Sequence, residues 1–249
     1  MIMGRYFLEV AYRGDGLSGF QIQDNAPTVQ SAIEHAFSVF FRKDIMMTGS
    51  SRTDAGVHAH QNFFHFDWEE GWNDACIYNL NALLPENIAI RSVRAVRVDA
   101  HARFDAVSRA YEYMVYRKKD PFLRDLGWYY PFATDVELLR QLADYVGQQT
   151  YFEAFSKRNT QVKTFICSIK HSSWEQEGDC IRYRVEGNRF LRGMVRGLVS
   201  TMLQVSRGNR SKDDFYALFD KPYTSQADFS APPQGLILRK VVFPDQIFI

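Results

Sequence analysis

The chain has 249 residues, of which 46% are hydrophobic and 24% are charged, and its formal net charge is +1. These values are ordinary for a folded globular protein, and the length allows one large core or two modest ones. The sequence contains neither an apolar run typical of a signal peptide nor an apolar stretch long enough to span a membrane, so we expect a cytoplasmic protein with no membrane association.

The first half of the chain predicts four strands and two helices. Apolar residues alternate in the expected strands and recur every three or four residues in the expected helices. Thr28 is expected to cap the first helix, and Pro85 to stop the second. The predicted order is βαββαβ, with elements at Tyr6–Tyr12, Val29–Phe41, Ile45–Met47, Asn62–Phe66, Cys76–Leu84 and Ile88–Val98.

The second half predicts the same order with one extra helix. Asp135 is expected to cap its first helix and Gly147 to end it. Ser211 and Asp214 have the spacing of a capping box, with Asp in place of the usual Glu. The expected elements lie at Ala106–Arg117, Val136–Val146, Phe165–Trp174, Ile181–Val185, Phe190–Val205, a short helix from Ser211, and Leu236–Phe243.

Two split-βαβ units in tandem predict an α+β fold with two ferredoxin-like halves, each an antiparallel sheet covered by helices on one face. We place the boundary so that residues 1–103 form the N-terminal half and residues 104–249 the C-terminal half. Three widely spaced cysteines, Cys76, Cys167 and Cys180, show no metal-ligand spacing and are expected to be buried thiols in a reducing compartment.

The most informative segment is Ser51–His60, a small polar loop between two apolar stretches. Gly49 and Gly56 flank Asp54, and scaffolds use short glycine-containing loops of this kind to display a reactive side chain at a surface. The alternative is an ordinary turn in which Asp54 caps its own backbone.

Positive charge is concentrated in one window of the second half. Between Ile181 and Lys212 the chain has eight basic residues and one acid, Glu186, a local charge of +7. An arginine-rich window of this kind is typical of a phosphate-binding face. The alternative is a solvated helix face and strand edge.

A different class of protein is also compatible with the loop. His58 and His60, with His65 and Asp54 nearby, resemble the H-x-H metal site of hydrolases, since alternate residues of a strand point the same way. A catalytic metal needs three or four placed ligands, and the other histidines show no ligand spacing. We therefore predict no metal.

Five segments resemble the TruA-type tRNA pseudouridine synthases, in the same order as in that family. The most specific is Arg52–Ala59, which is similar to the family's signature loop. The others are Gly19–Gln23 with Thr28–Gln30, Phe104 with Arg109–Tyr113, Asn188–Arg196, and Gly235–Leu238 with Val241–Pro244.

The resemblance implies that the two sheets join edge to edge into one mixed sheet with a central cleft. It also implies an isomerase that converts uridine to pseudouridine at positions 38, 39 and 40 of the tRNA anticodon stem-loop. The reaction needs no cofactor, and the chain contains no dinucleotide or P-loop motif. Family members bind tRNA as homodimers. The alternative that remains is a non-catalytic RNA-binding module.

The resemblance further assigns roles to individual residues. Asp54 is the nucleophile, Arg196 pairs with it and keeps it ionised, and the Tyr111 ring stacks on the extruded uracil, with acid–base duty for its hydroxyl. Whether the carboxylate attacks the sugar or acts at the base stays open. The expected substrate-binding residues are Tyr111, Arg52, Leu236, Arg189 and Arg192.

Two further points concern local sequence. Arg189, Arg192 and Arg196 are spaced i, i+3 and i+7, so one helical face would direct all three toward the cleft. Ser51 replaces the glycine that usually precedes the family's loop arginine, and Lys163 replaces a common arginine.

Overall fold

A computed structural model describes residues 3–69, 71–157, 162–222 and 225–249. The chain forms two compact units: unit 1 contains Met1–Val107 and Leu238–Ile249, and unit 2 contains Ser108–Ile237. The predicted halves differ from these units mainly at the C-terminus. Residues 238–249 belong to unit 1 because their backbone bonds to it, for example from Ile249 N to Ala95 O at 3.2 Å.

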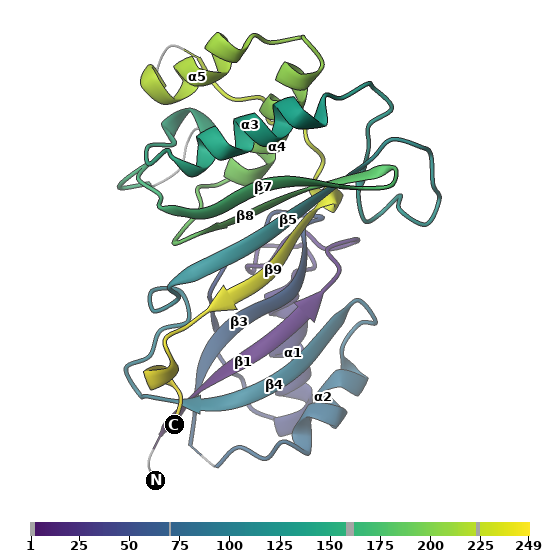
Figure 1. Ribbon diagram of the computed structural model, residues 1–249. Helices are drawn as coiled ribbons and strands as arrows, with labels where there is room; N and C mark the ends of the chain where they lie inside the picture. The colour runs from purple at the N-terminus through teal and green to yellow at the C-terminus, as the bar shows by residue number, and fades with distance from the viewer. Residues whose placement is uncertain (1–2, 70, 158–161, 223–224) are drawn as a thin grey trace. The chain divides into compact units, whose positions relative to one another are not determined.

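In unit 1 the strand order is β4-β1-β3-β9; β1 is antiparallel to both β3 and β4, and the short β2 is antiparallel to β3. Two helices, α1 and α2, lie on one face of this sheet (Figure 1). Its core is aromatic and aliphatic, with Leu8, Ile33, Phe37, Phe64 and Leu80 fully buried. The bounds are β1 (Gly4–Tyr12), α1 (Val29–Phe41), β2 (Thr48–Gly49), β3 (His58–Trp68), α2 (Cys76–Leu83), β4 (Ile88–Val96) and β9 (Leu236–Val242).

The helix boundaries of unit 1 follow the predicted signals. The Thr28 hydroxyl accepts the N–H of Ser31 at 3.1 Å and caps α1, and α2 ends just before Pro85. The predicted strand at Ile45–Met47 is wrong. Met46 is 91% exposed, and the N–H of Met47 donates to Glu34 Oε1 at 3.0 Å instead of to a neighbouring strand.

Unit 2 has the strand order β5-β8-β7, with the two-residue β6 parallel to β5. Its helices gather on one side of this sheet, α3 against β7 and α4 against β5 (Figure 1). The bounds are β5 (Ser108–Tyr116), β6 (Trp128–Tyr129), α3 (Val136–Gly147), β7 (Ile169–Glu177), β8 (Cys180–Gly187), α4 (Met194–Ser206) and α5 (Lys212–Asp220).

The predicted caps of unit 2 are confirmed. Asp135 accepts the N–H of Leu138 at 3.0 Å, and Ser211 and Asp214 form the capping box of α5. The strand predicted to begin at Phe165 begins later, at Ile169, because the N–H groups of Cys167 and Ser168 bond to Thr150 O and Asn188 Oδ1.

The predicted α+β class, with two tandem βαββαβ halves and one extra helix, is confirmed; the central cleft stays a prediction. None of the helices within the described residues combines the length and the apolar character needed to cross a membrane. All three cysteines are free thiols, and only Cys167 is buried, where burial raises its pKa to about 11.

Candidate active site

The loop between β2 and β3 holds Asp54 at the first position of a tight turn. The N–H of Val57 donates to Asp54 O at 3.2 Å, and Gly56 has a φ of 77°. A positive φ at the third position of such a turn favours glycine, so the Asp-Ala-Gly-Val order matches the backbone. The Asp54 side chain is half-buried, with Ala55 and Arg52 exposed beside it.

A buried hydrogen-bond network holds this loop in place. The hydroxyls of Tyr12 and Thr53 share a hydrogen bond of 2.8 Å, and Asn62 Nδ2 donates to Tyr12 Oη at 3.0 Å and to Ser51 O at 2.8 Å. The N–H of Phe20 donates to Thr53 O at 3.2 Å. The residue just before Asp54 is thus held by both its side chain and its carbonyl.

Two glycines let the chain approach the loop closely. A Cβ on Gly14 would lie 2.3 Å from Val57 O, and a Cβ on Gly19, whose φ is 108°, would lie 3.0 Å from Thr53 O. The N–H of Gly14 also donates to His58 Nδ1 at 2.9 Å. The loop therefore rests on the segment after β1, whose glycines the close approach requires.

Ser51 fits the place where the family usually has glycine. Within the described part of the chain, only Asn25 and Arg42 are non-glycine residues with a positive φ, so Ser51 adopts a backbone conformation open to any residue. Ser51 is buried, and its carbonyl is the one that Asn62 holds. Lys163, the second departure, is exposed in unit 2.

In unit 2, Arg196 lies in the first turn of α4. Its Nε donates to Ala231 O at 2.7 Å, and the Tyr113 hydroxyl donates to the next carbonyl, Pro232 O, at 2.7 Å. A Cβ on Gly235 would lie 2.5 Å from the Tyr113 ring, so this segment packs directly on β5. The segment between α5 and β9 thus orients the guanidinium of Arg196.

Tyr111 and Tyr113 share one face of β5 but have different environments. Tyr113 is fully buried, and this burial raises its pKa, whereas Tyr111 is only half-buried. The Tyr111 ring meets Phe190 edge-on at 5.1 Å. Arg109, on the same face, donates through NH1 to Asn188 O at 2.8 Å. Tyr113 is the core aromatic, and Tyr111 is the ring partly open to a ligand.

The predicted helical face of three arginines is wrong. Helix α4 begins at Met194, after Gly193 with a φ of 76°, so Arg189 and Arg192 precede the helix and only Arg196 belongs to it. The left-handed Gly193 breaks the apparent periodicity. Leu236, the last predicted substrate contact, is buried at the start of β9.

Neighbouring acids neutralise part of the positive charge in the basic window between Ile181 and Lys212. Arg184 binds Glu112 at 3.0 Å and Glu175 at 2.6 Å, and Arg182 pairs with Glu177, so these two arginines are largely neutralised. Arg207 lies over the Phe132 ring, 3.4 Å from its centre. Arg182 and Arg184 therefore contribute little to the net positive charge that the window presents.

The histidines of β3 act as hydrogen-bond acceptors. His58 and His65 are buried, and their Nδ1 atoms accept the N–H groups of Gly14 at 2.9 Å and Ala102 at 3.2 Å. His60 is exposed, 3.4 Å from Arg239 NH1. Among the residues that the structure describes, no group of three or more His, Cys, Asp or Glu side chains is placed to hold a metal ion.

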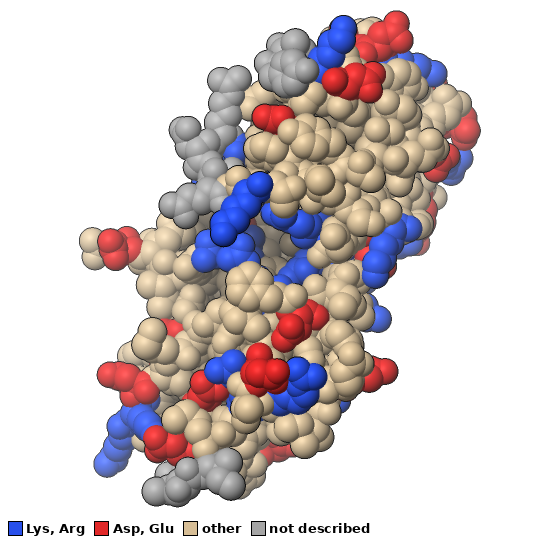
Figure 2. Space-filling model, turned by 90° about the vertical axis from the view of Figure 1, so that its left-hand side faces the viewer, with Lys and Arg blue, Asp and Glu red and all other residues tan. Residues whose placement is uncertain are grey.

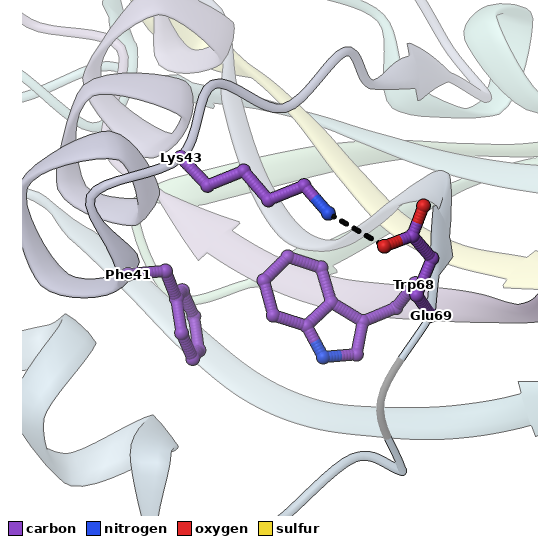
Figure 3. Close-up of a pocket in the computed structure, with 4 residues that line it drawn as sticks. All are labelled: Phe41, Lys43, Trp68 and Glu69. Carbon is purple, nitrogen blue, oxygen red and sulfur yellow. Dashed lines mark hydrogen bonds and ion pairs between the residues drawn. The ribbon is translucent and has the colours of Figure 1, made fainter. Parts of the chain in front are cut away.

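A small cavity elsewhere in unit 1 involves none of the predicted site residues. It measures about 80 Å³ and is lined by Phe41, Lys43, Trp68 and Glu69 (Figure 3). Lys43 Nζ lies 3.1 Å from Glu69 Oε2 and 5.4 Å from the centre of the Trp68 ring. This exposed ion pair over an aromatic ring is satisfied within the protein.

The comparison with known proteins defines the class of this chain. Residues 142–244 match the sequence model of the family described as tRNA pseudouridine synthase. This match includes α4 with Arg196 and omits the Asp54 loop.

Whole-chain relatives extend the match to the loop. A tRNA pseudouridine synthase A of Parabacteroides distasonis is 42% identical over 99% of this chain and 98% of its own length. Proteins of the same name from Bacteroides fragilis and Staphylococcus saprophyticus are 40% and 33% identical, covering 100% and 95% of this chain and 100% and 90% of their own lengths. The chain therefore belongs to the tRNA pseudouridine synthase A family, and the predicted isomerase class is confirmed.

Proposed function

We propose that this enzyme isomerises uridine to pseudouridine at positions 38, 39 and 40 of the tRNA anticodon stem-loop, with Asp54 as the nucleophile. The observation that carries the proposal is the loop between β2 and β3, which holds one carboxylate in a fixed turn through contacts to Tyr12, Phe20 and Asn62. Such fixation is what a displayed nucleophile requires.

The reaction exchanges one glycosidic bond for another. The bond from C1′ to N1 breaks and the bond from C1′ to C5 forms, while C5 loses its proton to solvent and N1 gains one. No oxidation or reduction occurs. Asp54 supplies an electron pair, either at C1′ or at the uracil ring, and the covalent intermediate divides one difficult step into two.

Arg196 keeps the nucleophile ionised in this proposal. A carboxylate that leaves water is protonated unless a cation offsets the loss of hydration. A guanidinium stays charged and can bind both carboxylate oxygens. The bond from Nε to Ala231 O supports this role, because it restricts the side chain before substrate binds.

Tyr111 receives the extruded uracil, and basic residues receive the backbone of the tRNA. The half-buried Tyr111 ring, set by its contact with Phe190, suits stacking on a base. Arg52, Arg189 and Arg192 are the expected phosphate contacts, with Leu236 beside the base. Figure 2 shows a group of Lys and Arg side chains near the middle of one face, which also carries Asp and Glu side chains elsewhere, and a local group of this kind suits phosphate contacts.

The decisive experiment is Asp54→Asn, assayed by tritium release from tRNA that carries 5-tritiated uridine. We expect less than about one hundredth of the wild-type rate and tRNA affinity within a few-fold, because phosphate contacts supply the affinity. Asp24→Asn, at an exposed loop position, is the matched control and should react normally. Substantial turnover by Asp54→Asn would remove Asp54 from the nucleophile role.

Arg196 and Arg192 provide a paired test of the ion pair. Arg196→Met should reduce the single-turnover rate far more than tRNA binding and raise the apparent pKa of the reaction, because Asp54 is then neutralised by protonation. Arg192→Met should mainly weaken binding and lower its salt dependence by about one phosphate. Normal turnover with poor binding in Arg196→Met would make Arg196 a phosphate contact.

The proposal includes a cytoplasmic homodimer that binds tRNA across two subunits. Its support is the membership of the family and the modest basic surface of a single chain, which two copies would double. Sedimentation at micromolar concentration should give the dimer mass, and a monomer alone would contradict it.

A further inference from the structure

The loop that follows β4 presents an aromatic side chain to solvent. Phe104 is 74% exposed, although it lies in a short segment of unit 1 whose neighbours Ala102 and Ala106 are buried. Exposing a whole phenylalanine ring forfeits roughly 1.5–3 kcal/mol of burial free energy. Single exposed aromatic rings are common on protein surfaces, so the case for Phe104 rests on the contacts of its ring and loop.

The Phe104 ring is the last of three rings in contact, the first of which is buried in the core. The buried His65 ring lies 4.6 Å from that of His101, and the His101 ring lies 4.2 Å from that of Phe104 at an interplanar angle of 38°. One side of the Phe104 ring is therefore supported by the protein. Its remaining surface is available to another flat group.

Hydrogen bonds make the loop rigid. The N–H of His101 donates to Asp105 Oδ2 at 2.7 Å, that of Ala102 to His65 Nδ1 at 3.2 Å, and that of Arg103 to His101 Nδ1 at 3.1 Å. The N–H of Asp105 donates to His101 O at 3.0 Å. Four of the five residues 101–105 are thus held through their amides, so the display of Phe104 is built into the loop.

A cation lies beside the ring. The Arg103 guanidinium carbon lies 5.8 Å from the centre of the Phe104 ring. An aromatic ring beside a guanidinium is a combination that proteins use for unpaired bases and the adjoining phosphates.

We propose that Phe104 is a second base-stacking platform, on which an unpaired or extruded nucleobase of the RNA substrate lies, with Arg103 on the adjoining phosphate. The inference rests on the proposed function, since it takes tRNA as the ligand. A protein partner would require a broad apolar patch, whereas this loop offers one exposed ring with an imidazole and a guanidinium beside it.

The test measures tRNA affinity against salt for wild-type enzyme, Phe104→Ala, Phe104→Trp and Arg103→Met. Phe104→Ala should weaken binding by about 5- to 100-fold with an unchanged salt slope, because stacking releases no counterions. Phe104→Trp should restore or improve binding. Arg103→Met should lower the salt slope by about one. Tyr78→Ala, which removes an 81% exposed ring from α2, should bind as wild type does.

Three results would overturn the platform. These are binding by Phe104→Ala within two-fold of wild type, a loss equalled by Tyr78→Ala, or a change in sedimentation that makes Phe104 a contact between protein chains. Thermal unfolding of Phe104→Ala should match wild type and so separate binding from folding. If wild-type enzyme isomerises tRNA and Phe104→Ala binds tRNA normally, only the stacking role of Phe104 is refuted. If Asp54→Asn forms pseudouridine, only the nucleophile role of Asp54 is refuted. A wild-type chain that does not bind tRNA refutes both.

Discussion

Substituting Gly14 tests whether the fixed geometry of the Asp54 loop controls the reaction. An alanine Cβ at this position would lie 2.3 Å from Val57 O and 2.7 Å from Gly56 C, whereas ordinary contacts begin at 3.4 Å. Both obstructing atoms are backbone atoms, so the loop must move by about 1 Å. A displacement of this size can cost about 10²-fold in rate when reacting groups need precise alignment.

We therefore expect Gly14→Ala to lower the single-turnover rate of tritium release by about 10²-fold while tRNA affinity stays within a few-fold. Overpacking should also lower the free energy of unfolding by roughly 1–3 kcal/mol. Gly71→Ala is the matched control, because a Cβ there meets no atom within 4 Å. If Gly14→Ala reacts within three-fold of wild type, the loop tolerates displacement and the positioning argument is refuted.

Two other perturbations follow from the same unit. Tyr12→Phe removes the hydroxyl between Asn62 and Thr53, so it should lower the single-turnover rate and reduce the free energy of unfolding by about 1–3 kcal/mol. Tyr6→Phe, on the same strand, should leave the rate unchanged. Equal rates for the two variants would show that the hydrogen-bond network does not position the loop. Burial, with His101 and Arg5 nearby, lowers the pKa of His65 to about 4 against a usual 6.5, and Asp67 and Asp105 offset this only in part. The stability that neutral His65 contributes is thus complete above pH 6.5, and the free energy of unfolding should fall by roughly 2–3 kcal/mol as the pH drops to 4. Urea unfolding should therefore show a steeper pH dependence for wild type than for His65→Gln.

The elements that were predictable from sequence are those with local signals. Helix α1 has an apolar stripe and the Thr28 cap, and α3 has the Asp135 cap, so their limits follow from adjacent residues. The two-residue strand β6 is too short to show a period. The start of α4 was misplaced because Phe190 and Leu191 continue its apolar spacing, and only the conformation of Gly193 interrupts it.

The candidate site, too, was predictable from sequence only where its signals are local. The loop motif identified Asp54, but the residues that support the loop are distant in sequence: Tyr12 lies 41 residues from Thr53 and 50 from Asn62. Neither Tyr12 nor Asn62 has a local sequence pattern that distinguishes it from an ordinary strand residue. The segment after β1 did offer a signal in its closely spaced glycines, Gly14, Gly16 and Gly19, since dense glycine marks unusual backbone or close approach.

The structure also separates the residues of the loop motif by what they do. Thr53 bonds to Tyr12, Gly56 supplies the left-handed turn, and the ring of His58 receives an N–H from Gly14. These three residues hold the loop, so its conformation explains their presence. Beside them, Arg52 is exposed and Asp54 is half-buried. The motif is therefore largely scaffold, and the groups that the proposed function assigns to the substrate are the Asp54 carboxylate and the Arg52 guanidinium.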